Sequence, residues 1–282
     1  VYRNNVEWDE ESQDYNGGFV DLNAGLDGRA FGAVKWTDYN KDGYIDLIVS
    51  GLQLGDNNNQ TAATTVYTNT DGQLFTPSIE LELPPLFDTS IDSGDLDNDG
   101  DIDFVINGRN TDDQWKKYIY FRDEDFLVQS ENSNVDSFDE QGLEGGIIKI
   151  IDIHTDGDQD IIGVGQPFFK LNTLINENTQ FNNWSWNHLN NPALEVFNQQ
   201  IYYMGEKDNN YQFWSSDINS GYSSSSNVQN VEGLKFGDIA VGDYDNNGIE
   251  DLLVTGQNET ADPVTILYNR SCLLYTSDAA DD

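Results

Sequence analysis

The sequence predicts an all-β protein built from repeated units of four short strands. Three observations lead to this prediction: an aspartate-rich loop recurs, the loops are regularly spaced, and apolar segments of strand length flank each loop. The loops begin at Asp38, Asp95, Asp152 and Asp243, which gives two steps of 57 residues and one of 91. A unit of this length is slightly longer than a propeller blade of roughly 40–50 residues. We therefore expect a β-propeller of four-stranded blades that is incomplete, with about five units visible that begin and end in mid-blade.

The first unit illustrates the four expected strands. Ala33–Thr37 leads into the loop, and Tyr44–Ser50 leaves it as a nearly continuous apolar run, which is typical of a buried strand. Thr64–Asn69 and Leu74–Leu81 follow, separated by an Asp-Gly turn signal in residues 70–73. No unit has evident helical periodicity. A β-sandwich is the alternative architecture, but it does not predict a constant step between loops.

The repeats also predict how the chain is divided. We expect a half blade at 1–30, loop-bearing blades near 31–85, 86–140 and 141–190, a blade that has lost its loop near 191–230, and a partial blade at 231–271. The lost loop accounts for the long step. Because the chain begins at Val1 without a leader-like segment, we expect it to be part of a longer precursor.

The segment 272–282 differs from everything before it. It resembles the translation of a transposase adapter used in DNA library preparation, over ten consecutive codons. We therefore expect it to be an artefact rather than part of the protein, which would include Cys272, the single cysteine.

Composition excludes several classes of function. The chain has 13 basic and 51 acidic residues and a formal net charge of −38. A nucleic-acid-binding protein needs a basic surface, so this class is excluded. The same charge is repelled by anionic membrane surfaces, and no apolar run approaches the roughly 20 residues needed to cross a bilayer. The 14 Tyr, 14 Phe and 6 Trp favour a folded chain over a disordered one.

The chemistry of the repeats lies in the loop, which reads Asp-x-[Asp/Asn/His]-x-[Asp/Asn]-Gly-x-x-Asp. Side-chain oxygens at positions 1, 3, 5 and 9, with a backbone carbonyl at position 7, form a set of hard ligands that suits Ca²⁺. Glycine at position 6 allows the sharp turn. Mg²⁺ is disfavoured because it requires stricter octahedral geometry. The candidate ligand residues are Asp38, Asn40, Asp42, Tyr44 and Asp46; Asp95, Asp97, Asp99, Asp101 and Asp103; Asp152, Asp156, Asp158 and Asp160; and Asp243, Asp245, Asn247, Ile249 and Asp251.

An EF-hand shares the first six loop positions but needs a carboxylate at position 12 and flanking helices. Position 12 is Val49, Ile106, Gly163 or Val254 in the four loops, and apolar strands flank every loop. None of these side chains can bind calcium. The EF-hand interpretation is therefore rejected, and the closing carboxylate is assigned to position 9.

The repeat has further features in common with a known family. Phe31-Gly32 and Phe236-Gly237 precede the first and last loops, and the apolar strands after these two loops end in glycine. This combination resembles the FG-GAP repeat, called VCBS in bacterial proteins, which is the blade unit of integrin-α-like propellers. The resemblance covers most of residues 1–270. It implies a calcium-stabilised and commonly seven-bladed propeller, in a secreted or cell-surface bacterial protein.

The four loops are not equivalent as metal sites. The second loop carries aspartate at all four side-chain positions and should bind calcium most tightly. The first and last loops substitute the neutral oxygens of Asn40 and Asn247. The third places His154 at position 3, and imidazole nitrogen is a poor ligand for calcium, so this site is doubtful. Bound calcium is expected to be structural rather than catalytic.

Catalytic signatures are absent from the sequence: there is no Gly-x-Ser-x-Gly, His-Glu-x-x-His or P-loop motif, and the two histidines are His154 and His188. Trp184, Trp186 and Trp214 could form a sugar-stacking platform, although aromatic residues in sheets more often fill the core. We expect a non-catalytic extracellular adhesion or interaction module with a protein or glycan partner. The alternative is the propeller portion of a secreted polysaccharide-active enzyme, or a lectin-like module.

Overall fold

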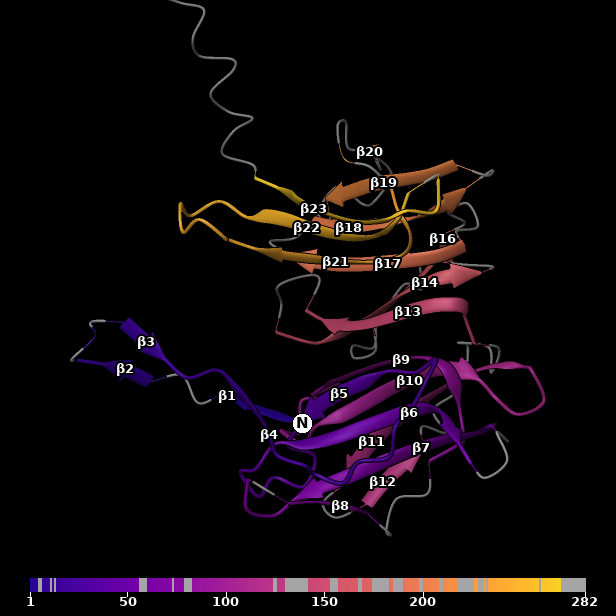
Figure 1. Ribbon diagram of the computed structural model, residues 1–282. Helices are drawn as coiled ribbons and strands as arrows, with labels where there is room; N and C mark the ends of the chain where they lie inside the picture. The colour runs from indigo at the N-terminus through magenta and orange to yellow at the C-terminus, as the bar shows by residue number, and fades with distance from the viewer. Residues whose placement is uncertain are drawn as a thin grey trace, which may run out of the picture.

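The computed structural model describes residues 1–269 except 5–6, 11, 13, 56–59, 73, 79–82, 124–125, 130–141, 153–156, 167–168, 174–182, 185–189, 198–199, 208–209, 218–225, 228–230, 232 and 259. Every regular element in this part of the chain is a β-strand (Figure 1). The described residues contain no helix with the length and hydropathy needed to cross a bilayer. Four sheets of four strands and one of three form the body of the protein, so the predicted all-β propeller of four-stranded blades is confirmed.

Each blade is an antiparallel meander in which strands follow one another in chain order. Blade 1 contains β5 (Val34–Thr37), β6 (Asp46–Leu54), β7 (Gln60–Asn69) and β8 (Phe75–Pro77). Blade 2 contains β9 (Phe87–Gly94), β10 (Asp103–Arg109), β11 (Trp115–Asp123) and β12 (Phe126–Gln129). Blade 3 contains β13 (Glu144–Ile151), β14 (Asp160–Gln166), β15 (Phe169–Thr173) and β16 (Asn183–Trp184).

The two remaining blades follow the same order. Blade 4 contains β17 (Asn190–Phe197), β18 (Gln200–Lys207), β19 (Asn210–Asp217) and β20 (Ser226–Asn227), and blade 5 contains β21 (Lys235–Gly242), β22 (Asp251–Gln257) and β23 (Pro263–Tyr268). Before blade 1, β1 (Tyr2–Asn4) pairs with β4 (Phe19–Asp21), and β2 (Glu7–Asp9) pairs with β3 (Asp14–Asn16).

Successive blades pack face to face through their first strands. β9 contacts β5 and β13, and β17 contacts β13 and β21, so the first strands lie next to one another in order (Figure 1). Side chains on the second strands alternate between the two neighbouring blades. On β10, Phe104 and Ile106 pack in the cluster with Ile48 of blade 1, whereas Val105 between them packs in the cluster with Ile148 of blade 3. This period of two explains why these strands are apolar almost without interruption: both faces of an inner blade are covered.

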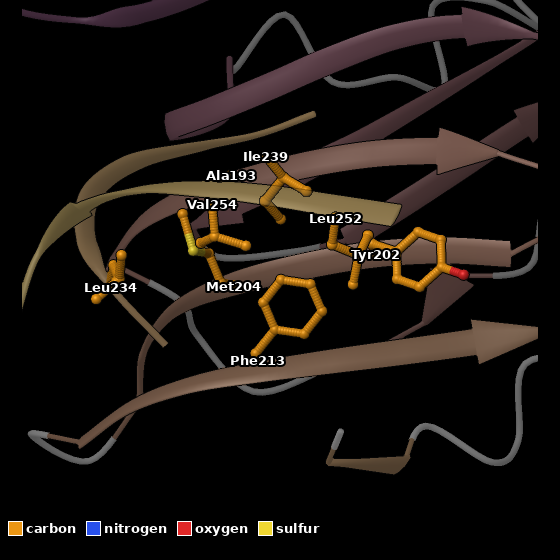
Figure 2. Close-up of a cluster of buried hydrophobic side chains, with 8 residues drawn as sticks. All are labelled: Ala193, Tyr202, Met204, Phe213, Leu234, Ile239, Leu252 and Val254. Atoms are coloured by element: carbon orange, nitrogen blue, oxygen red, sulfur yellow. The ribbon is translucent and has the colours of Figure 1, made fainter. Parts of the chain in front are cut away.

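The interface between blades 4 and 5 is a cluster of buried aliphatic and aromatic side chains. Figure 2 shows Ala193, Tyr202, Met204, Phe213, Leu234, Ile239, Leu252 and Val254, which converge from both blades. Met204 and Phe213 are fully buried there. On the other face of blade 4, Trp214 stacks on Tyr203 with ring centroids 5.3 Å apart.

The Phe-Gly dipeptides are explained by the start of the first strand. Phe31 and Phe236 both have φ of 51°, in the left-handed region, and Asp88 and Gly145 take similar values of 49° and 61° at the same position of blades 2 and 3. A Cβ on Gly32 would lie 1.8 Å from the Ser50 carbonyl oxygen, so only glycine fits after Phe31. The dipeptide therefore marks a strained entry into the blade rather than a core contact, and both phenylalanines are exposed.

Candidate metal centres

Four nine-residue loops connect the first strand of a blade to its second. We name them after their blades: loop 1 (38–46), loop 2 (95–103), loop 3 (152–160) and loop 5 (243–251). In each, the Oδ2 atom of the leading aspartate accepts a hydrogen bond from the amide of the glycine at position 6, with distances between 2.7 and 3.1 Å. These glycines have φ between 83° and 98°, which side chains rarely tolerate. The shared sequence pattern therefore produces a shared turn.

A second set of hydrogen bonds orients the middle of the loop. In loop 1 the Asn40 side chain accepts from the Asp42 amide at 3.0 Å, and the Asp42 side chain accepts from the Tyr44 amide at 2.8 Å. Loop 2 repeats this with Asp97 and Asp99, at 3.3 and 2.7 Å. Each acceptor oxygen is thereby held toward the inside of the turn. Polar side chains at positions 3 and 5 are required for the turn as well as for a metal.

The aspartate at position 9 lies at the first residue of the second strand and is buried. Asp46 and Asp103 are both 0% exposed. Asp103 accepts hydrogen bonds from the Arg122 amide at 2.9 Å and the Leu96 amide at 2.7 Å, and Asp46 accepts one from the Asn69 amide at 2.8 Å. Position 9 therefore ties the loop to the body of its blade.

This burial has an electrostatic consequence. Removal from water raises the pKa of Asp103 to about 6; the amides of Arg122 and Leu96 oppose the shift, and the charges of Asp97 and Asp99 add to it. Burial likewise raises the pKa of Asp46, with smaller contributions of the same sign from Asp42 and Asp38. A buried negative charge among other negative charges is unfavourable unless a cation compensates it.

The structure brings some of the predicted ligands close together. Carboxylate oxygens of Asp95, Asp97 and Asp99 lie within 4.8 Å of one another, as do those of Asp243, Asp245 and Asp251. Loop 1 does not bring its three aspartates within this distance, and Asp103 lies outside the group of loop 2. Asp156 and His154 of loop 3 lie outside the described residues, whereas Asp152, Asp158 and Asp160 lie within them.

Position 7 is expected to contribute a backbone carbonyl, whereas positions 1, 3, 5 and 9 are expected to contribute side-chain oxygens. Tyr44 is 43% exposed and Ile249 has no ligating side chain, so a backbone carbonyl at this position stays a prediction. The Asp101 carboxylate pairs with Lys41 of loop 1, and one of its oxygens lies 3.9 Å from Arg122 Nε. Its side chain is thus engaged away from the acidic group of its own loop. This contact between loops is not evident from the sequence.

Buried oxygen atoms without donors provide the test of whether a cation fits. Among the described residues, Asp38 Oδ1, Asp95 Oδ1 and Asp46 Oδ2 are buried and have no hydrogen-bond partner. Buried polar atoms are almost always satisfied, and a carboxylate oxygen can be satisfied only by a donor or a cation. Loops 1 and 2 therefore fit a hard metal ion, and the all-oxygen donor set is of the kind that calcium takes.

Of the other candidate residues, Trp214 and Trp184 lie in the described part of the chain. Trp214 is 9% exposed and stacks on Tyr203, which is a core role and not that of a sugar platform. His188 and Trp186 lie outside the described residues, and Trp184 belongs to β16.

Comparison with known proteins agrees with the loop pattern. Residues 38–106 match the family model of the FG-GAP-like repeat. Residues 38–106 are therefore similar to an FG-GAP-like repeat, as the loop pattern predicts. The match begins at the first residue of loop 1 and ends in β10, so it includes both loops with unsatisfied buried oxygens. No curated protein matches the chain.

Several solved structures are similar to the chain. The lectin AAL of Aleuria aurantia, as a mutant in complex with Fucalpha1-6GlcNAc, is 10% identical; the alignment covers 92% of this chain and 79% of the lectin, with a TM-score of 0.47. A β-xylosidase, RS223, is 10% identical, with 87% and 94% covered and a TM-score of 0.44. A GH43_1 enzyme from Xanthomonas citri is 9% identical, with 84% and 85% covered and a TM-score of 0.40.

Proposed function

We propose that this protein is a calcium-binding module in which Ca²⁺ in loops 1, 2 and 5 stabilises one rim of the propeller. The observation that supports it most is the set of buried, unpartnered oxygens on Asp38, Asp46 and Asp95. In loop 5, three carboxylates converge within 4.8 Å, which supports a third site. Loop 3 is the weakest candidate, because His154 stands at position 3.

Calcium is the best match among common cations. It accepts six to eight oxygen ligands in flexible geometry, and each loop offers carboxylate or amide oxygens together with a backbone carbonyl. Mg²⁺ needs stricter geometry, and softer metals prefer nitrogen or sulfur. Loop 2 carries the most negative charge and is assigned the tightest site.

We further propose that the module acts outside the cell, as a non-catalytic surface that binds a protein or a glycan. Calcium-binding modules of extracellular proteins typically work at dissociation constants near 10⁻⁴–10⁻³ M, which only an extracellular supply would saturate. A propeller presents its loops on a rigid frame, which suits recognition. The strongly acidic surface favours partners that are neutral or basic.

Titration calorimetry with CaCl₂ tests the first proposal. We expect up to three ions per chain and clearly weaker binding of MgCl₂. In the variant Asp95→Ala, the tightest site should be lost while the others remain. Absence of calcium binding at millimolar concentration would overturn the proposal.

A glycan panel and a protein-capture screen, both in the presence of calcium, test the proposal of a non-catalytic binding surface. Binding without chemical change of the captured ligand is the expected result. Turnover of a glycan by the purified chain would instead support a polysaccharide-active enzyme.

A further inference from the structure

Neighbouring loops contact one another in a repeated way. Lys41, at position 4 of loop 1, forms an ion pair with Asp101, at position 7 of loop 2. Asn98, at position 4 of loop 2, donates a hydrogen bond to Asp158, at position 7 of loop 3. The same two positions are thus used in both contacts. The link from one loop to the next is a feature of the repeat rather than an accident of one side chain.

The conformation of the residue at position 4 depends on whether its own loop is ordered. It lies between the candidate ligands at positions 3 and 5, and it takes a left-handed φ of 56° at Lys41 and 58° at Asn98. This conformation is uncommon outside glycine, so the surrounding turn holds it in place. A loop that is ordered by an ion therefore also fixes the direction in which its position-4 side chain leaves the backbone.

Position 7 receives this contact on the next loop. The Asp101 side chain is 14% exposed, close to Lys41 and to Arg122 Nε. Arg122 also approaches loop 1, because its guanidinium lies 5.7 Å from the centroid of the Tyr39 ring, and its amide donates to Asp103. Loops 1 and 2 are therefore joined in two ways: directly by Lys41 and Asp101, and through Arg122, which lies near Tyr39 and Asp101. The Arg122 amide also donates to Asp103, the aspartate at position 9 of loop 2.

The series is interrupted at blade 4. There, residues 198–199 alone separate β17 from β18, and Phe197 pairs directly with Gln200. Blade 4 has no nine-residue loop at this place, so loop 5 has no neighbouring loop on that side. Its position 7 is Ile249, which cannot form an ion pair.

We propose that loops 1 and 2 bind calcium as a positively coupled pair, linked by Lys41 and Asp101, whereas loop 5 binds independently. This rests on the proposed calcium-binding function. Ordering loop 1 fixes Lys41, which holds Asp101 and so reduces the entropy that loop 2 loses when it binds its own ion. By linkage, loop 2 must help loop 1 by the same factor.

Amide hydrogen exchange read on loop peptides tests the coupling, because it follows each loop separately. The quantity measured is the calcium concentration that gives half-maximal protection of the peptides containing Gly43, Gly100 and Gly248. In Asp97→Ala, which removes a ligand from loop 2, we expect this concentration to rise about fivefold or more for loop 1 and to stay unchanged for loop 5. The matched control is Asp245→Ala, which removes the ligand at the same position of loop 5 and should leave loops 1 and 2 unchanged.

The variant Lys41→Met isolates the link, because it removes no ligand oxygen and keeps a side chain of similar length. Coupling predicts weaker calcium binding in both loops 1 and 2. Simple electrostatics predicts the opposite, since the variant loses a positive charge that repels the ion. Asn246→Met, at the same position of loop 5, should leave loops 1 and 2 unchanged.

The outcomes separate the two proposals. Calcium-dependent protection of loop 1 that is unchanged in Asp97→Ala, or tighter binding in Lys41→Met, would overturn the coupling and leave calcium binding intact. A lack of calcium-dependent protection in every loop of the unaltered protein would overturn calcium binding itself, and the coupling with it.

Discussion

Blades 2 and 4 have the same four-stranded meander but differ at one end. Blade 2 joins its first two strands through loop 2, which contains five aspartates in nine residues, and blade 4 joins them through residues 198–199 alone. Both blades are nevertheless packed against both neighbours. The long acidic loop is thus not needed to form a blade. The unpartnered buried oxygens of loops 1 and 2 fit a cation, which supports the calcium-binding role that we propose for these loops.

The two blades also differ in what stabilises them. Blade 4 is held by aromatic and aliphatic packing on both faces, with Phe213 and Met204 fully buried. In blade 2, burial raises the pKa of Asp103, and the two backbone amides that donate to it only partly oppose this shift. We therefore expect the stability of blade 4 to be independent of calcium and that of blades 1 and 2 to depend on it. The following predictions test this difference, from the largest expected effect to the smallest.

The largest effect should come from the core of blade 4. Phe213→Ala leaves a cavity in the cluster of Figure 2 and should reduce the free energy of unfolding by about 3–5 kcal/mol. The loss should be equal in calcium and in chelator, as measured by denaturant unfolding. Phe197→Ala, at a residue that is 37% exposed, is the control and should cost clearly less. A loss of unfolding free energy that differs between calcium and chelator would contradict the expectation that the stability of blade 4 is independent of calcium.

Removal of a ligand should have the next largest effect, and only in calcium. At a calcium concentration 100 times the dissociation constant, one site contributes about 2.7 kcal/mol to the free energy of unfolding. Asp95→Ala should lose this contribution, and Asp152→Ala in loop 3 should lose less. Thermal unfolding of both variants at equal calcium concentrations measures the difference. Equal losses would contradict the ranking of the loops.

The effect of Asp95→Asn on the free energy of unfolding should have opposite signs in chelator and in calcium. The carbonyl of the introduced amide side chain can still accept from the Gly100 amide, as Asp95 Oδ2 does at 3.0 Å, and its NH₂ group would fill the place of the unpartnered oxygen. In chelator the variant should be as stable as the unaltered protein, or more stable by up to about 1 kcal/mol. In calcium it should be less stable, because one charged ligand is lost. Denaturant unfolding under both conditions measures the sign, and a loss of stability in chelator would count against the cation site.

The smallest effect should come from the ion pair between blades 3 and 4. Lys149 Nζ lies 3.2 Å from Glu195 Oε2, and both side chains are partly exposed. Lys149→Met should change the free energy of unfolding by about 0.5 kcal/mol or less, and high salt should remove the difference. A loss above about 2 kcal/mol would mean that charge pairing, and not apolar packing, holds blade 4 to its neighbour.

The sequence was sufficient to predict the blade architecture and the shape of the loops. The sharp turn expected from glycine at position 6 is present in all four loops, where the amide of this glycine donates a hydrogen bond to the leading aspartate. Several strand boundaries of blade 1 differ from the prediction. β6 spans Asp46–Leu54 and not Tyr44–Ser50, because the loop extends through position 8, where Ile45 is 50% exposed. β7 begins at Gln60 and not at Thr64, and β8 is Phe75–Pro77 within the described residues. Tyr44 and Ile45 are apolar but belong to the loop and not to the strand.

The contacts between loops could not be predicted in the same way. Lys41 and Asp101 lie in adjacent blades and approach only because the blades pack side by side. Periodicity within one unit carries no information about this packing. An alignment of the repeats shows Lys41 and Asn98 at position 4, and Asp101 and Asp158 at position 7 of the next loop, but only the arrangement of the blades brings these residues together.

Thermal unfolding of the unaltered protein, in excess calcium and in excess chelator, tests the central claim most directly. If loops 1, 2 and 5 hold calcium in the folded state, the midpoint of unfolding must rise with calcium concentration and fall in chelator, because a ligand that binds only the folded state stabilises it. A melting curve that is the same under both conditions would contradict the claim.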